Sequence, residues 1–292
     1  MHTLAKKFKL TRLAPTPSGF LHLGNALSFA LTSAIAKLTN ADVILRIDDL
    51  DRDRVEQTYI DDVFETLQFL GIQWQFGPLN TLDFQQQWSQ LCRLQLYKPA
   101  LGELARGKKV FACICSRKQL QAANYTCNCA EKKLPLDTVN AAWRLITDDA
   151  TLNINTLTKG TVELSLPSEM KNFIVRKKDG HPAYQLSSLI DDVHFGVDLV
   201  VRGEDLWPST IAQHYLARCL NLIEFNKAIF HHHQLLTVNG SEKLSKSAGA
   251  TSIQHMRAQG LTRADIYNKI GATLGITKPC AYLTDISNNL FS

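Results

Sequence analysis

The first fifty residues carry a hydrophobic pattern that predicts a strand, a helix and a second strand. The segment Lys9–Ala14 is predicted as a buried strand. Between Asn25 and Leu38, apolar side chains recur every three or four residues, a spacing typical of a helix with one buried face. Val43–Ile47 is again mostly apolar and is predicted as a second buried strand. A strand, a helix and a strand in this order predict a parallel sheet with a right-handed crossover.

Strand and helix signals continue to alternate after this unit. Glu56–Leu70 is predicted as a helix that ends at Gly71, and Asp198–Gly203 is predicted as a further strand of the sheet. A helix is expected from about Pro208, because proline suits the first turn of a helix.

The last sixty residues give weaker signals. The triplet His231–His233 is expected to lead into an apolar strand at Leu235–Val238, and not to bind a metal. The tail from Ser252 to Ser292 is predicted to be helical at first and irregular afterwards.

The middle of the chain differs in composition from the rest and is interpreted as an insertion between two halves of one sheet. It contains a cluster of cysteines and a polar stretch at 148–161. Phe173–Arg176 is followed by an Asp-Gly turn and a return through Tyr184, which predicts a hairpin. The expected division is therefore a first half of the sheet at 1–95, an insertion at 96–185, a second half at 186–247 and a short helical region at 248–292.

Composition narrows the class of protein. Of the 292 residues, 45% are apolar and 20% are charged, which is enough apolar surface for a folded core. No apolar run has the length of a membrane span, and the first residues lack the apolar centre of a signal peptide. A cytoplasmic, monomeric enzyme without membrane contact is expected. The net charge of +5 is compatible with a polyanionic partner.

Two short segments far apart in the chain indicate a nucleotide site. His22-Leu23-Gly24-Asn25 follows the first strand and opens the first helix, where an imidazole and backbone N–H groups can bind phosphate. Lys243-Leu244-Ser245-Lys246-Ser247 is a small-residue loop with two ammonium groups, suited to closing over a leaving pyrophosphate. Positive charge and alignment are what adenylate formation requires, since the attacking carboxylate is already ionised.

These segments resemble the HIGH and KMSKS signatures of class I aminoacyl-tRNA synthetases, with Asn25 where the first signature has histidine. The stretch Thr11–Gly19, the acidic run after Arg46, and the Arg-Gly-Glu-Asp segment at Arg202 are similar to the glutamyl branch of that class. The resemblance implies an α/β fold: a class I synthetase Rossmann-type parallel sheet, a zinc-bearing insertion and a short C-terminal helical region. It also implies that His22, Lys243 and Lys246 are catalytic, and that ATP, used with Mg²⁺, contacts His22, Gly24, Asn25 and Lys246.

The resemblance further implies a glutamate pocket. Glutamate has two carboxylates and one ammonium group, so a pocket for it should supply two guanidinium groups and one acid. The implied residues are Arg12, Leu13, Ala14, Pro15, Thr16, Asp48, Tyr184 and Arg202. Asp48 stands where the family usually has glutamate. The neighbouring charges are interpreted as an exposed ion-pair run: Arg46, Asp49, Asp51, Arg52 and Arg54.

Four of the seven cysteines lie between Cys113 and Cys129, which favours a metal site in a chain without an export signal. Clustered thiolates repel unless a cation neutralises them, and tetrahedral zinc does so. The C-x-C and Y-x-x-x-C spacing resembles the zinc site of glutamyl-queuosine tRNA(Asp) synthetases. That likeness implies structural zinc bound by Cys113, Cys115, Tyr125 and Cys129, with Cys127 as the competing fourth ligand.

The extent of the resemblance shapes the expected function. It runs from about Lys9 to Leu261, whereas full glutamyl-tRNA synthetases continue into an anticodon-binding domain. A compact chain of this length, with a radius of gyration of roughly 19 Å, cannot hold the acceptor end in its active site and touch the anticodon of the same tRNA. The glutamyl-queuosine family forms glutamyl-adenylate without tRNA and transfers glutamate to queuosine in the anticodon loop of tRNA(Asp). The same activity is expected here.

Three alternatives stay open at this point. The chain could be a minimal glutamyl-tRNA synthetase that charges the tRNA 3′ end, or a zinc-bearing RNA-binding module without catalysis. A class I-like ligase with a small acceptor is the third. The pairing of His22 with Lys243 and Lys246 favours an enzyme over the binding module.

Overall fold

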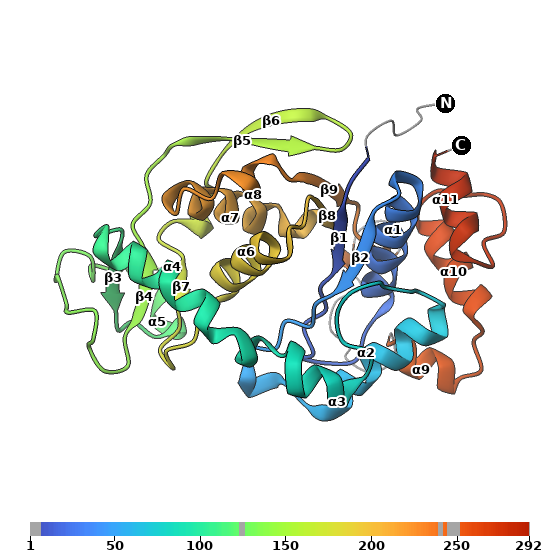
Figure 1. The fold of residues 1–292 in the computed structure, drawn as a ribbon, viewed down its shortest axis with the longest axis horizontal. Helices are drawn as coiled ribbons and strands as arrows, with labels where there is room; N and C mark the ends of the chain where they lie inside the picture. Colours follow the sequence, from blue (N-terminus) through green and yellow to red (C-terminus); the bar gives the residue numbers. More distant parts are fainter. Residues whose placement is uncertain (1–6, 123–125, 239–241, 244–251, 292) are drawn as a thin grey trace. The chain divides into compact units, whose positions relative to one another are not determined.

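The computed structural model describes residues 7–122, 126–238, 242–243 and 252–291. The chain forms two compact units (Figure 1). The first unit contains residues 1–92, 197–206 and 228–292, and the second contains residues 93–196 and 207–227. This grouping differs from the four consecutive segments expected from the sequence, because the helices between two strands of the parallel sheet group with the second unit, and the C-terminal helices group with the first.

Parallel pairing builds the sheet of the first unit. Its strands are β1 (Leu10–Leu13), β2 (Asp42–Leu45), β8 (Leu199–Gly203) and β9 (Ile229–His233). They lie in the order β2-β1-β8-β9, and each neighbouring pair is parallel. The predicted parallel sheet is therefore confirmed.

Helix α1 (Leu23–Thr39) connects β1 to β2 and packs against the sheet. Leu27, Ala30, Leu31, Ala34 and Ile35 of the predicted apolar face are buried, whereas Leu38, which the same spacing includes, is 42% exposed at the end of the helix. Helix α2 (Gln57–Leu70) ends at Gly71, whose φ of 69° is the left-handed conformation that glycine adopts without strain. The short helices η1 (Arg52–Arg54), α3 (Thr81–Asp83), η2 (Phe84–Trp88) and η3 (Gln90–Arg93) follow the second strand.

The C-terminal tail is helical for longer than the sequence indicated. It forms α9 (Ile253–Ala258), α10 (Arg263–Thr273) and α11 (Leu283–Phe291). Helices α10 and α11 pack against α1 in the first unit, as Figure 1 shows. The expectation of an irregular end was wrong, because a few apolar side chains anchor these polar helices: Ile266, Tyr267, Ile270 and Ile286 are buried.

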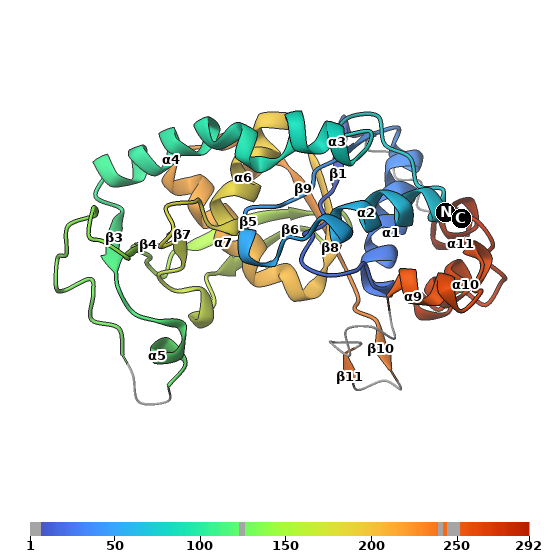
Figure 2. The ribbon, with the colours of Figure 1, turned by 90° about the horizontal axis from the view of Figure 1, so that it is seen from below.

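The histidine triplet was also misplaced. His231, His232 and His233 form the second half of β9, and the strand predicted after them is reduced to β10 (Thr237–Val238). Strand β10 pairs with β11 (Glu242–Lys243) in an antiparallel hairpin that extends from the end of β9 (Figure 2). Imidazoles fit this buried strand because burial lowers their pKa values and keeps them neutral: the pKa of His231 falls to about 4.

The second unit holds a three-stranded antiparallel sheet, ordered β3-β4-β7, and an antiparallel hairpin of two further strands. The sheet strands are β3 (Val110–Cys113), β4 (Ala142–Leu145) and β7 (Ile174–Arg176); the hairpin pairs β5 (Thr151–Thr156) with β6 (Gly160–Ser165). The helices are α4 (Leu94–Arg106), α5 (Arg117–Gln121), η4 (Ser168–Met170), α6 (Tyr184–Phe195), α7 (Trp207–Cys219) and α8 (Ile223–Lys227), and η5 (Glu204–Leu206) belongs to the first unit.

The hairpin predicted around Asp179-Gly180 is only partly present. The turn forms, since the Lys177 N–H donates to the carbonyl of His181 at 2.8 Å. The return strand is reduced to a single bridge between Arg176 and Pro182, and helix α6 begins at Tyr184. Among the described residues, no helix is both long enough and apolar enough to cross a membrane.

Candidate active site and cysteine cluster

The topology of the first unit creates a position for a ligand. From β1 the chain passes through α1 to β2 on one side, whereas β8 is followed by β9 on the other side. The order of the strands therefore reverses between β1 and β8, and ligands of open parallel sheets bind at such a point, beyond the carboxyl ends of the strands. Arg12 and Arg202 lie near these ends, and the His22 turn follows β1.

The residues that leave β1 extend the strand pairing. The carbonyl of Leu13 accepts a hydrogen bond from the Arg46 N–H at 2.8 Å, and the carbonyl of Pro15 accepts one from the Asp48 N–H at 2.9 Å. The Thr16 carbonyl accepts from the Ser18 N–H at 2.9 Å and starts the turn toward α1. The backbone from Leu13 to Thr16 is thus fixed beside the segment that carries Asp48.

His22 caps helix α1 and is itself held by the helix. Its Nδ1 accepts a hydrogen bond from the Gly24 N–H at 3.1 Å, and its own backbone N–H donates to Oδ1 of Asn25 at 3.0 Å. A side chain at position 24 would push the imidazole away, since an added Cβ would lie 2.9 Å from the His22 ring. Because Nδ1 accepts, the proton of the neutral imidazole is on Nε2, which leaves a hydrogen-bond donor for a ligand.

Burial lowers the pKa of His22, although the nearby carboxylate of Asp205 opposes this shift. The imidazole is therefore neutral at physiological pH. Asp205 lies in η5, directly after β8, and its Oδ1 lies close to Gly203, where an added Cβ would be only 2.7 Å away. Sequence reasoning quoted Asp205 as part of a motif but gave it no role.

Leu21, directly before His22, is tied to two distant segments. Its N–H donates to Oδ2 of the buried Asp62 on α2 at 2.8 Å, and Thr66 donates to the other carboxylate oxygen at 3.2 Å. Its carbonyl accepts from the Ile253 N–H at 2.7 Å, and His22 forms an antiparallel bridge with Ser252. The turn of the first motif is thus bonded to the segment that begins at Ser252.

Asp62 was missed in the sequence, although one signal was available. It is a charged residue on the face of α2 that also carries Val63 and Thr66, both fully buried. A charge at such a position needs a specific hydrogen-bond partner.

The two arginines converge within the first unit. Arg12 and Arg202 are both buried, and Arg12 Nη1 donates to the carbonyl of Val201 at 3.1 Å. The guanidinium carbon of Arg202 lies 5.4 Å from the centroid of the Phe230 ring, and Arg202 is the strand partner of His232 on β9. Burial first, and then the charges of Arg202 and Arg12 among others, lower the pKa of His232 to about 2. The His232 imidazole therefore lies within electrostatic range of both guanidinium groups.

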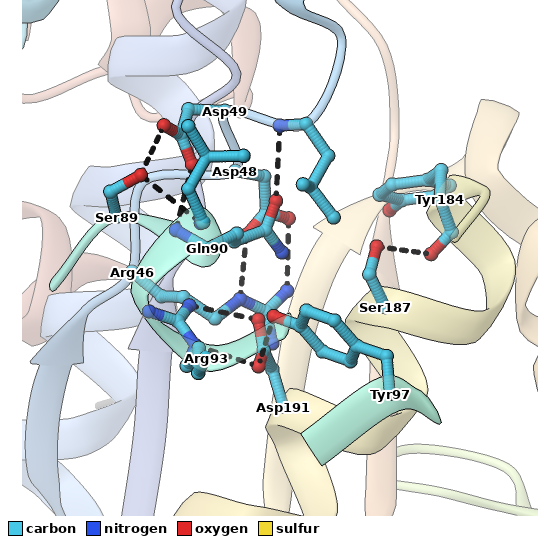
Figure 3. A network of polar contacts seen from close by, with 12 residues as sticks. Arg46, Asp48, Asp49, Ser89, Gln90, Arg93, Tyr97, Tyr184, Ser187 and Asp191 are labelled. Carbon is cyan, nitrogen blue, oxygen red and sulfur yellow. Dashed lines mark hydrogen bonds and ion pairs between the residues drawn. The ribbon is translucent and has the colours of Figure 1, made fainter. Parts of the chain in front are cut away.

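Asp48 and Asp49 are both held by protein groups. Asp48 accepts from Nε of Arg46 at 2.8 Å and from Nη2 at 3.1 Å, and both residues are buried. Asp49 accepts from the Ser89 hydroxyl at 2.6 Å and from the Gln90 N–H at 2.8 Å (Figure 3). The expectation of an exposed ion-pair run is wrong for Arg46 and Asp49. It holds for Asp51, Arg52 and Arg54, which are partly or fully exposed and form local pairs.

Tyr184 belongs to the second unit, where its half-exposed ring marks the start of α6. The same helix carries Asp191, whose two oxygens each accept from Arg93 at 2.9 Å while one also accepts from the Tyr97 hydroxyl at 2.8 Å (Figure 3). A glutamate-binding role for Tyr184 stays a prediction.

Three other expected residues lie partly or wholly outside the described part of the chain. The backbone of Lys243 forms the end of β11, and its side chain is not described. Lys246 lies outside the described residues, as does Tyr125.

The second unit brings four thiols together. Cys113 ends β3, Cys115 follows it, and Cys127 and Cys129 come after α5. The four sulfur atoms all lie within 4.8 Å of one another, and no disulfide joins them. Burial raises the pKa of Cys113 to about 12, so this thiol stays protonated unless a cation compensates its charge. Such a donor set fits zinc.

Comparisons with known proteins agree with this geometry. A family described as "tRNA synthetases class I (E and Q), catalytic domain" matches residues 10–281. The glutamyl-Q tRNA(Asp) synthetase of Methylococcus capsulatus is 35% identical, covering 83% of this chain and 77% of that protein. The glutamyl-Q tRNA(Asp) synthetase of Rhodobacter capsulatus is 30% identical, covering 90% and 99%.

A solved structure, a glutamate tRNA ligase from Elizabethkingia meningosepticum, shares the fold with a TM-score of 0.68 at 22% identity. That match covers 83% of this chain and 53% of the ligase. The class I synthetase fold expected from the sequence is confirmed. The chain therefore belongs to the class I tRNA synthetases of the E and Q type and is similar, over most of its length, to glutamyl-Q tRNA(Asp) synthetases.

Proposed function

We propose that this chain activates glutamate with ATP, forming glutamyl-adenylate without tRNA. It then transfers the glutamyl group to queuosine in the anticodon of tRNA(Asp). The observation that carries the proposal is the convergence of Arg12 and Arg202 at the strand-order reversal that the His22 turn also borders. The choice of queuosine as the acceptor rests on the names of the relatives, because the two glutamyl-Q tRNA(Asp) synthetases match most of this chain.

Activation needs one bond to form and one to break at the α-phosphorus. A glutamate carboxylate oxygen attacks phosphorus, the bond to the bridging oxygen breaks, and pyrophosphate leaves with the electron pair. The Nε2–H of neutral His22 donates to a phosphate oxygen, beside the N–H groups at the start of α1. No general base is needed. Lys243 and Lys246 are proposed to bind the leaving pyrophosphate, and ATP is expected to enter with Mg²⁺.

Glutamate specificity follows from two fixed cations. Arg12 and Arg202 each offer a planar guanidinium that can bind one carboxylate through two hydrogen bonds. Their burial strengthens such bonds, since competing water is excluded. Asp48 is the proposed partner of the α-ammonium group, and Tyr184 is proposed to line the pocket. Because Arg46 already takes both oxygens of Asp48, an ammonium group would have to share this carboxylate.

Transfer then moves the acyl group to a hydroxyl of the queuosine cyclopentenediol. The hydroxyl oxygen attacks the glutamyl carbonyl, the bond from that carbon to the phosphate oxygen breaks, and AMP leaves with the electron pair while its phosphate takes up the hydroxyl proton. The anticodon loop is proposed to dock where a glutamyl-tRNA synthetase holds the tRNA acceptor end. A monomer in the cytoplasm is part of this proposal.

A structural zinc ion is also proposed for the cysteine cluster of the second unit. The residues that would hold it include Cys113, Cys115 and Cys129; the resemblance implies Tyr125 as the fourth ligand, and the sulfur of Cys127 lies within 4.8 Å of the other three sulfurs. Bound zinc would keep the ligands as thiolates and stabilise the fold by on the order of 10 kcal/mol of apparent folding energy.

Glutamate activation is tested by pyrophosphate exchange into ATP. The proposal expects exchange that requires glutamate and proceeds without any RNA. Exchange that appears only when tRNA is added would contradict it and favour the alternative of a glutamyl-tRNA synthetase. An absence of exchange under all conditions would favour a non-catalytic RNA-binding module.

The acceptor is tested with two preparations of tRNA(Asp) that differ only in queuosine. Transfer of labelled glutamate is expected to the tRNA that carries queuosine and not to queuosine-free tRNA. Equal labelling of both would show that the acceptor is a group other than queuosine, and labelling of a small molecule alone would favour a ligase with a small acceptor.

A further inference from the structure

The fourth position of the cysteine cluster distinguishes this chain from the pattern that it resembles. The resemblance implies a tyrosine ligand, yet the sequence places a cysteine two residues after Tyr125. The sulfur of Cys127 lies 3.7 Å from that of Cys113 and 3.6 Å from that of Cys115. We propose that Cys127 completes a tetrahedral zinc centre of four thiolates with Cys113, Cys115 and Cys129. This inference refines the zinc centre of the proposed function.

The spacing of the sulfur atoms fits one metal ion. Zinc–sulfur bonds of about 2.3 Å in a tetrahedron place any two sulfurs about 3.8 Å apart. The Cys113–Cys127 and Cys115–Cys127 distances are given above, and Cys115 and Cys129 are 3.5 Å apart. A disulfide would need about 2.05 Å, which none of these pairs approaches. The fold thus holds Cys127 at the spacing of a ligand.

The local structure explains how four residues from two segments meet. Strand β3 delivers Cys113, and α5 begins shortly after Cys115, with Ser116 as its cap. The returning chain then places Cys127 and Cys129 against the first pair. Cys113, Cys115 and Cys129 are buried and pack with Phe111, and Cys127 is partly exposed. The cluster is therefore accessible to an ion from the side of Cys127.

Chemistry favours a thiolate over a phenolate as the fourth ligand. A free thiol has a pKa of about 8.5 and a phenol one of about 10, so the phenol costs about 2 kcal/mol more to deprotonate. Thiolate is also the softer ligand and the usual one in structural zinc sites. The Nζ of Lys178 donates to the carbonyl of Ile114, between Cys113 and Cys115, at 2.8 Å and adds positive charge beside the anionic centre.

X-ray absorption of the purified zinc protein tests the ligand set directly, and it needs neither glutamate nor RNA. The proposal expects four sulfur neighbours at about 2.3 Å. Three sulfurs and one oxygen at about 2.0 Å would overturn it and favour Tyr125. Wild-type protein without stoichiometric zinc would overturn both this inference and the zinc centre proposed above. Neither outcome bears on pyrophosphate exchange, which tests the proposed reaction separately.

The number of sulfur ligands can also be measured in solution, by the absorption of variants that bind cobalt in place of zinc. The sulfur-to-cobalt absorption grows with the number of thiolates, so Cys127→Ser should lose about one quarter of it, from four ligands to three. Tyr125→Phe and Cys92→Ser, which removes an exposed thiol outside the cluster, should keep the full intensity. Full intensity in Cys127→Ser, or a changed cobalt spectrum in Tyr125→Phe, would overturn the proposal.

Discussion

The hydrogen bond between Asp62 and the Leu21 N–H is expected to align the nucleotide site. Both residues are 2% exposed, so water cannot replace the carboxylate if it is removed. Asp62→Leu keeps the approximate size of the side chain and removes the acceptor. Asp62→Asn is the matched control, because its amide oxygen can still accept from Leu21 while the amide nitrogen faces Thr66.

The size of the effect follows from the cost of a buried backbone donor without a partner, about 1–3 kcal/mol. Leu21 immediately precedes His22, and its carbonyl also accepts a hydrogen bond from the Ile253 N–H at 2.7 Å. If this whole free-energy cost weakens the alignment of the His22 turn, kcat/KM for ATP decreases about 5- to 160-fold, because about 1.4 kcal/mol is a factor of ten. The KM for glutamate should change little, since Arg12 and Arg202 lie on other elements.

Pyrophosphate exchange at varied ATP and at varied glutamate measures both constants, and urea unfolding at the same pH measures stability. The reasoning expects a loss confined to ATP in Asp62→Leu and near-normal exchange in Asp62→Asn. It is refuted if Asp62→Asn is as impaired as Asp62→Leu, because the acceptor oxygen would then not be what matters. Equal losses for ATP and glutamate would also refute it and would point to general misfolding.

Three further predictions concern the glutamate pocket, acid stability and the metal. Arg202→Ala should raise the KM for glutamate about 10- to 150-fold, the cost of charge-assisted hydrogen bonds of about 1.5–3 kcal/mol, and leave the KM for ATP nearly unchanged; equal losses would show that the residue is misassigned. The pKa of His231 is about 4 when folded and 6.5 otherwise, so the unfolded chain binds more protons between these values and stability falls as the pH drops below 6.5. At pH 5.5 this group should lower the free energy of unfolding by about 1.4 kcal/mol relative to pH 8. His231→Phe should reduce the pH dependence of that free energy, measured by urea unfolding, by the same amount. An unchanged pH dependence would contradict the assignment. A chelator should lower the melting temperature of the wild type by more than that of Cys113→Ser, and an equal shift in both would exclude the cluster as its target.

The sequence predicted the part of the fold that short-range periodicity determines. Helix α1 and the strands on either side of it follow directly from apolar spacing, because one face of each must be buried. The His231–His233 strand was missed because imidazoles look polar in sequence, whereas burial in a sheet keeps them neutral. Helix α11 was missed although Leu283, Ile286, Leu290 and Phe291 recur at helical spacing, because the segment is short and its packing against α1 depends on residues more than two hundred positions away.

The same limit applies to the site. Local charge alternation suggested that Arg46 and Asp49 are exposed, but Asp49 is satisfied by Ser89 and Gln90, about forty residues later, and can therefore be buried. Short motifs led to the predicted roles of His22 and Arg202, since such motifs consist of adjacent residues. Asp62 and Cys127 gain their importance from partners that only the folded chain supplies.

The most direct test of the central claim is the position of the label after transfer from labelled glutamate. The tRNA is digested with nuclease, and the fragment that carries glutamate is identified. The account predicts label on the modified base at the first anticodon position of tRNA(Asp). Label on the 3′-terminal adenosine would contradict it.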